Sequence, residues 1–195
     1  MSRAAHGDRG QTIGVYIVAM AALFFLAFAY FAVGQAAVTR NSAQTAADAA
    51  ALAAARQERD DVHDAFLAAL LAGDGTAIGD LLAKVTGAGD PCGAASAYAE
   101  QNHASLGPCV PVADPPGFTV QVVTRGTVGR SVVKGSEDVH GKATATAVVE
   151  PRCHVGDTSG HTVNFSCRNG PLAVDPTAPG FVLDLSAFFS VHLSK

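Results

Sequence analysis

Near its N-terminus the chain carries one uninterrupted apolar stretch. No charged residue occurs between Gly10 and Thr39, and residues 12–34 are almost entirely aliphatic, aromatic or alanine. A hydrocarbon core about 30 Å thick is crossed by roughly 20 helical residues. The stretch exceeds that length, so it predicts a transmembrane helix over residues 10–39 that lies in the lipid bilayer.

The helical pattern continues beyond the apolar stretch. Between residues 35 and 59 the chain has neither glycine nor proline and is rich in alanine, the best helix former. Phe66 and Leu70 keep the helical spacing of apolar residues. We predict an alanine-rich helical stalk over residues 40–72, with a kink or break at residues 59–61.

Residues 73–115 predict a mixed helical and loop segment. Apolar spacing indicates a short helix over residues 76–85, which Asp74 or Thr76 would cap. A further turn or two of helix is expected over residues 94–104.

After Pro115-Pro116-Gly117 the residues follow the two-residue period of a strand. Val120, Val122 and Thr124 would lie on one face, and the residues between them on the other. We predict a β-rich domain over residues 116–195, with strands at 118–125, 142–150, 162–167 and 181–193. The expected class is α+β: a long transmembrane and stalk helix followed by a small, mainly antiparallel β domain.

Four cysteines follow residue 90, as two local pairs: Cys92 with Cys109, and Cys153 with Cys167. An even count beyond a membrane anchor predicts two disulfides, although crossed and nested connectivities stay open. A zinc site is the alternative for the second pair, with His154 and His161 as further ligands.

The flanking charges predict the orientation of the anchor. Arg3 and Arg9 precede the span, and only Arg40 follows it closely. The positive-inside rule then makes residues 1–9 a cytoplasmic tail and places the bulk of a single-pass cell-membrane protein outside. A cleaved signal peptide, cut after Ala27-Phe28-Ala29, is the alternative, but the apolar run continues past that point.

Composition and motifs argue against several classes of function. The net charge is −4 with no basic cluster, which excludes nucleic acid as the main partner. No phosphate-binding loop or nucleophile motif is present, so we expect no enzyme, no cofactor and no metal. The acidic residues Glu58, Asp60, Asp61 and Asp64 are interpreted as a solvated helix face.

Within the stalk, Arg40, Gln44 and Asp48 recur every four residues and share one helix face. A neighbouring face carries small side chains, among them Ala47. Two interpretations remain open: a rigid stalk with a solvated polar stripe, or a helix that packs against other helices through Arg40, Gln44, Ala47 and Asp48.

Arg9-Gly10, the uncharged span and the alanine-rich run from Arg40 to Ala55 together resemble the N-terminal region of Tad-type (Flp) pilus-assembly TadE/TadG-like proteins. The resemblance covers residues 7–57. It implies a pilin-like accessory protein whose partners are other pilin-like or Tad platform membrane proteins, in a homo- or hetero-oligomer. A long helix followed by a small β domain also resembles the pilin architecture.

Two positions depart from related patterns. Prepilin-type processing would cut between Gly10 and Gln11, but Val15 stands where processed pilins carry glutamate. Some TadG-like proteins carry a von Willebrand A domain with an Asp-x-Ser-x-Ser metal site. The run from Asp184 to Phe188 has Phe188 in place of the last serine, so we predict neither that domain nor its metal. The alternative function is a membrane-tethered extracellular binding module unrelated to pili, which would recognise its ligand through the disulfide loops.

Overall fold

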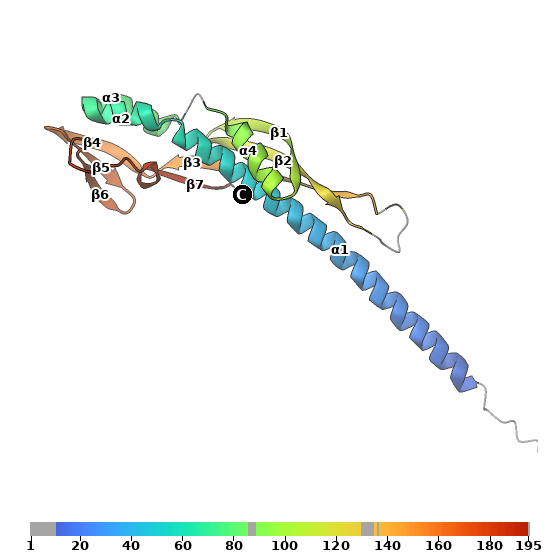
Figure 1. The fold of residues 1–195 in the computed structure, drawn as a ribbon. Coiled ribbons are helices and arrows are strands. Elements are labelled where there is room, and N and C mark those ends of the chain that lie inside the picture. The colour runs from blue at the N-terminus through green and yellow to red at the C-terminus, as the bar shows by residue number, and fades with distance from the viewer. Residues whose placement is uncertain (1–10, 86–88, 130–134, 136, 195) are drawn as a thin grey trace, which may run out of the picture.

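The computed structural model describes residues 11–85, 89–129, 135 and 137–194 of the 195-residue chain. One long helix projects from a compact group of strands and shorter helices (Figure 1). The helices are α1 (Gln11–Asp60), α2 (His63–Ala72), α3 (Gly75–Ala83) and α4 (Pro91–Gln101). The strands are β1 (Ala104–Ala113), β2 (Pro116–Thr127), β3 (His140–Pro151), β4 (Cys153–Ser159), β5 (Thr162–Cys167), β6 (Gly170–Val174) and β7 (Phe189–Leu193), with a short 3-10 helix η1 (Leu185–Ala187) before β7.

This arrangement confirms the predicted fold class. A long apolar N-terminal helix is followed by a four-stranded sheet of order β1-β2-β3-β7 and a three-stranded sheet of order β4-β5-β6. Every neighbouring strand pair is antiparallel. The chain also contains the two local disulfides, Cys92–Cys109 and Cys153–Cys167, so the crossed and nested connectivities are wrong.

Helix α1 is 50 residues long, which corresponds to about 75 Å at 1.5 Å per residue. It ends at Asp60, and α2 begins at His63, so the break lies where the sequence predicted it. Helix α3 begins where the Asp74 side chain accepts hydrogen bonds from the backbone N–H groups of Thr76 and Ala77. Asp74 is therefore the cap of this helix.

The C-terminal half of α1 packs against the four-stranded sheet, chiefly β2 and β3, and against α4 (Figure 1). Alanine makes this contact possible because its small side chain lets the helix and strand backbones approach closely. Eight alanines of α1 are buried there: Ala43, Ala46, Ala47, Ala50, Ala51, Ala53, Ala54 and Ala55.

The three-stranded sheet joins the rest of the domain through aromatic rings. The ring of Phe188, after η1, lies 4.9 Å from that of Phe66 on α2 and 4.9 Å from that of Phe165 on β5. Phe189 of β7 lies 6.2 Å from Phe66. Tilted and edge-on pairs at these separations are favourable, so the cluster fastens α2 and both sheets together.

Several strand predictions need correction. Residues 104–113 form strand β1, where a helical turn and loop were expected. Gly107, Pro108 and Pro111 suggested a loop, yet β1 is an edge strand, where proline is tolerated, and its register shifts between Leu106 and Cys109. The strand predicted over 181–193 is confined to β7, since residues 181–184 are irregular and residues 185–187 form η1. Strands β4 and β6 were not predicted.

Candidate functional site: the membrane span and the faces of α1

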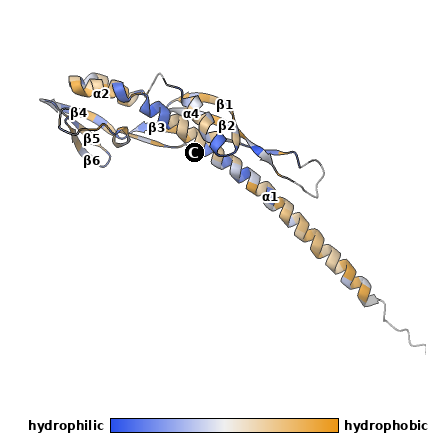
Figure 2. Cartoon of the chain, in the orientation of Figure 1, coloured by the Kyte–Doolittle hydropathy of each residue, from blue (hydrophilic) through white to orange (hydrophobic). Residues whose placement is uncertain are grey.

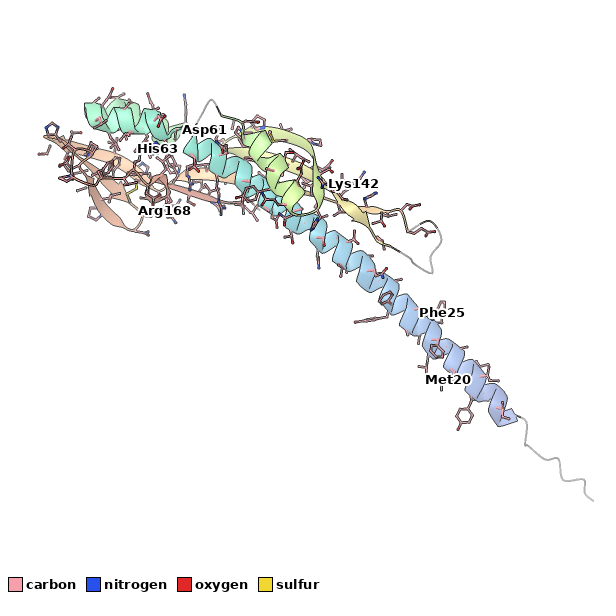
Figure 3. All side chains as sticks on the ribbon, viewed as in Figure 1. Met20, Phe25, Asp61, His63, Lys142 and Arg168 are labelled. Carbon is pink, nitrogen blue, oxygen red and sulfur yellow. A yellow bond between two sulfur atoms is a disulfide. The ribbon has the colours of Figure 1, made fainter. Side chains whose placement is uncertain are left out.

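The N-terminal half of α1 is apolar and bare. Residues 13–28 are all exposed, and Phe24, Phe25 and Leu26 are each more than 60% exposed. Figure 2 shows the apolar colouring of this half, and Figure 3 shows Met20 and Phe25 pointing away from a helix that nothing covers there. Among the described helices, α1 alone is long and apolar enough to cross a membrane.

An exposed apolar surface of this size is unfavourable in water, since each square ångström of apolar area contributes about 25 cal/mol when it is buried. A helix satisfies its own backbone hydrogen bonds, so it can enter lipid without leaving polar groups unpaired. The bare half of α1 is therefore a candidate membrane span.

The small-residue face of α1 is occupied within the chain itself. Ala47, predicted as a helix-packing residue, is fully buried, as are Ala43, Ala50 and Ala54. They lie among β2, β3 and α4. Ala47 therefore contributes to the core of this chain and presents no surface to a partner.

The polar stripe lies on the outer side of the same helix. Arg40 and Gln44 are exposed, and Asp48 is half-buried. The Gln44 side-chain amide donates a 2.7 Å hydrogen bond to the Asp48 carboxylate. The structure thus separates Ala47 from Arg40 and Gln44, and only the latter two are freely available for the predicted partner contact.

A groove lies between α1 and the end of β2. It runs from Ala27 to Thr39 on the helix, has Thr127 and Val128 on its other wall, and encloses about 670 Å³. The side-chain oxygen Oε1 of Gln35 is buried there and has no hydrogen-bond partner among the described residues. The sequence gave one weak signal for this groove, which is a polar glutamine near the end of an uncharged and mostly apolar run.

The acidic residues near the α1–α2 junction are engaged in local contacts. Asp60 pairs with Arg59 at 2.7 Å, and Asp64 pairs with His63 at 3.0 Å. Asp61 accepts a 2.7 Å hydrogen bond from Gln57. Figure 3 shows Asp61 and His63 at this junction. These pairs stabilise the helix ends and do not converge on a common site.

All four cysteines form disulfides that link neighbouring elements. Cys92–Cys109 joins α4 to β1, and Cys153–Cys167 joins β4 to β5. Because both sulfurs of the second pair are bonded to each other, neither is a thiolate that could bind zinc. The alternative with His154 and His161 is thus wrong.

Gly10 lies outside the described residues, and Gln11 is the first residue of α1. Asp184, considered for a metal motif, instead accepts a 2.8 Å hydrogen bond from the backbone N–H of Ser186 at the start of η1. The side chain of Ser186, and then its N–H, lower the pKa of Asp184 below its usual 3.8.

Comparison with known proteins adds one observation about the N-terminal part of the chain. Residues 10–57 match a family model described as putative Flp pilus-assembly TadE/G-like. These residues form a TadE/G-like segment. No curated protein and no solved structure matches the chain.

The TadE/G-like segment covers the bare half of α1 and most of its alanine-rich half, and ends three residues before the helix does. The description of the matched family names Flp pilus assembly, and the match is confined to this segment. The family match therefore confirms the resemblance seen in the sequence. It does not extend to α2–α4 or to the two sheets.

Proposed function

We propose that this protein is a membrane-anchored, pilin-like accessory component of a Tad/Flp pilus assembly or a related secretion system. The observation that carries the proposal is the coincidence of the TadE/G-like segment with a single helix that has two environments. Its first half is bare and apolar, and its second half is the central core element of a disulfide-stapled domain.

In the proposed arrangement residues 1–9 are cytoplasmic, residues 10–39 span the cell membrane, and residues 40–195 lie outside. The two disulfides support the outside location of the domain, because disulfides persist in oxidising compartments. Cysteine labelling of intact cells tests the orientation. A Ser159→Cys variant, at the exposed end of β4, should react with an impermeant maleimide, and reaction only after lysis would contradict the orientation.

The proposed partners are other pilin-like or platform membrane proteins of the Tad system, contacted through Arg40 and Gln44. Both are exposed within the TadE/G-like segment and lie just beyond the proposed span. No ion pair to Arg40 is formed by any other residue that the structure describes. Its charge is thus available to a carboxylate on a partner.

Site-specific photocrosslinking in native membranes tests this contact. A photoreactive residue at position 44 should give adducts with Tad components, and these should disappear when the pilus genes are deleted. A matched probe at Tyr98, which is 43% exposed on α4 outside the segment, serves as the control. Adducts only with unrelated envelope proteins would argue against the proposal.

A second candidate function, an outward-facing binding module, is favoured by one feature of the distal half. A hollow of about 440 Å³ lies beside β6 and η1, with Phe181 and Leu183 in its lining. Val182 lies at the same place and is 82% exposed. A Val182→Asp variant that loses adhesion or ligand capture, while keeping its Tad adducts, would support this second role.

A further inference from the structure

We propose that the groove between α1 and the end of β2 holds one phospholipid of the outer leaflet, and that it selects phosphatidylethanolamine. The inference rests on the proposed membrane anchoring and goes beyond it, because it assigns a defined lipid site to the chain. Its evidence is the level of the groove along α1, its lining and the unpaired oxygen of Gln35.

The level of the groove follows from the length of the helix. Within the proposed span of residues 10–39, a helix that enters the 30 Å hydrocarbon core near residue 12 leaves it roughly 20 residues later, near residue 32, and the remaining residues lie at headgroup level. The groove extends from Ala27 to Thr39 on α1. It therefore straddles the boundary, with Ala27 and Phe31 at the depth of acyl chains and Gln35 at the depth of headgroups.

The strands also reach this level. Thr127 and Val128, at the end of β2, form the wall opposite the helix. Figure 1 shows β2 and β3 extending beyond the rest of the sheet toward the bare half of α1. The hairpin thus reaches the outer membrane–water boundary, and one lipid is sheltered between it and α1.

The lining fits the two ends of such a lipid. Toward the span it is apolar, with Tyr30 and Phe31 exposed on the surface that the bilayer would cover. Toward the domain, Oε1 of Gln35 is a buried acceptor without a donor among the described residues. A headgroup ammonium can donate to it, whereas the choline headgroup has no N–H to give.

Charge favours this occupant over others. No residue that the structure describes in the lining is charged, so the described lining offers no positive side chain to an anionic lipid. A neutral lipid with an N–H donor fits better.

Two glycines of α1 provide a matched pair of variants. A Cβ added at Gly34, in the groove, would meet no atom within 4 Å, and the same holds at Gly14, outside it. Gly34→Leu therefore adds an apolar side chain to the groove lining with no clash at its Cβ, and Gly14→Leu makes the same change on the bare helix. Gln35→Leu removes the acceptor and keeps an apolar side chain.

Native mass spectrometry of the full-length protein, released from nanodiscs with equal amounts of phosphatidylethanolamine and phosphatidylcholine, tests the proposal. The wild type and Gly14→Leu should each retain one phosphatidylethanolamine per chain. Gly34→Leu should lose at least nine-tenths of it. Gln35→Leu should retain lipid while its preference between the two headgroups falls toward parity.

Three results would overturn the proposal. They are equal retention of the two lipids by the wild type, undiminished retention by Gly34→Leu, and a dimer that Gly34→Leu abolishes, which would place a second copy in the groove. The wild-type comparison needs no variant to fold. The assay contains no pilus component, so its failure is distinct from a failure of the crosslinking experiment.

Discussion

Gly141 of β3 lies so close to Ala43 of α1 that a Cβ on the glycine would be 3.1 Å from the alanine Cβ. The same added atom would lie 2.7 Å from the backbone carbonyl oxygen of Thr39. At this point the strand backbone rests directly on the helix, at the level where the proposed span gives way to the outer domain. The contact fixes how the sheet sits on the anchor.

Replacing this glycine should therefore destabilise the domain. Gly141→Val is expected to lower the free energy of unfolding by about 1–3 kcal/mol, because the helix backbone cannot move away from the new side chain at low cost. Chemical denaturation of the detergent-solubilised protein measures the change. Gly126→Val, at a strand position with no atom within 4 Å of an added Cβ, is the control. Equal effects of the two variants would contradict the contact.

The buried alanine face of α1 should not tolerate larger side chains. Ala47→Leu introduces three heavy atoms into a fully buried site and should cost about 1–3 kcal/mol of unfolding free energy. Ala36→Leu, at an exposed position of the same helix, should leave stability nearly unchanged. If Ala47→Leu were neutral for stability yet abolished the Tad crosslinks, the face would serve a partner rather than the core.

The disulfides should behave as two independent local staples. Cys92→Ser combined with Cys109→Ser should cost about 3 kcal/mol, because the bridge closes a separation of 17 residues in the unfolded chain. Intact mass should rise by about 4 Da on full reduction of the wild type, as expected when two bridges open. The single variant Cys92→Ser should leave Cys109 reactive toward maleimide and Cys153 protected. Labelling of Cys153 in that variant would show that the pairs exchange.

Acid should weaken the turn that precedes β7. Hydrogen bonds from Ser186 lower the pKa of Asp184 below 3.8, so its carboxylate is more easily kept charged in the folded state than in the unfolded one. The stabilisation is present above pH 3.8 and is lost as the pH falls through the lower, folded-state pKa. Thermal unfolding between pH 5 and pH 2 should show a smaller acid-induced drop in Asp184→Ala than in the wild type.

Asp175 supplies an internal comparison for the pH experiment. Its pKa is also lowered, by hydrogen bonds from the side chain and then the backbone N–H of Thr177. It lies directly after β6, and because its pKa is also lowered in the folded state, its contribution to stability has the same sign. In the double variant Asp175→Ala with Asp184→Ala, the melting temperature should fall less between pH 5 and pH 2 than in either single variant. The same pH dependence in the wild type, both single variants and the double variant would refute both assignments.

Local sequence signals were sufficient for the helical half of the fold. The uncharged run and the alanine-rich run each predict helix, and the paired aspartates near residue 60 predicted the break before His63. Asp74 was one of two candidate caps, with Thr76, and the structure selects it because its side chain accepts from N–H groups two and three residues away. The local spacing of the cysteines likewise pointed to the observed pairs.

The candidate site was predictable only in part. Arg40 and Gln44 were identified from their spacing, and the structure leaves both exposed. The groove beside Gln35 was not foreseen, because its opposite wall comes from Thr127, some 90 residues further along the chain. No periodicity within a helix reports which distant strand will lie beside it.

The sequence by itself determined the long helix, its apolar first half, the TadE/G-like segment and the α+β class. Only the tertiary structure decided what covers the alanine face of α1. Alanine is equally suited to a bare stalk, a partner helix or a neighbouring sheet, since helix propensity is a property of the residue alone. Burial of the alanine face depends on which other elements pack against it. In this structure β2, β3 and α4 of the same chain cover that face.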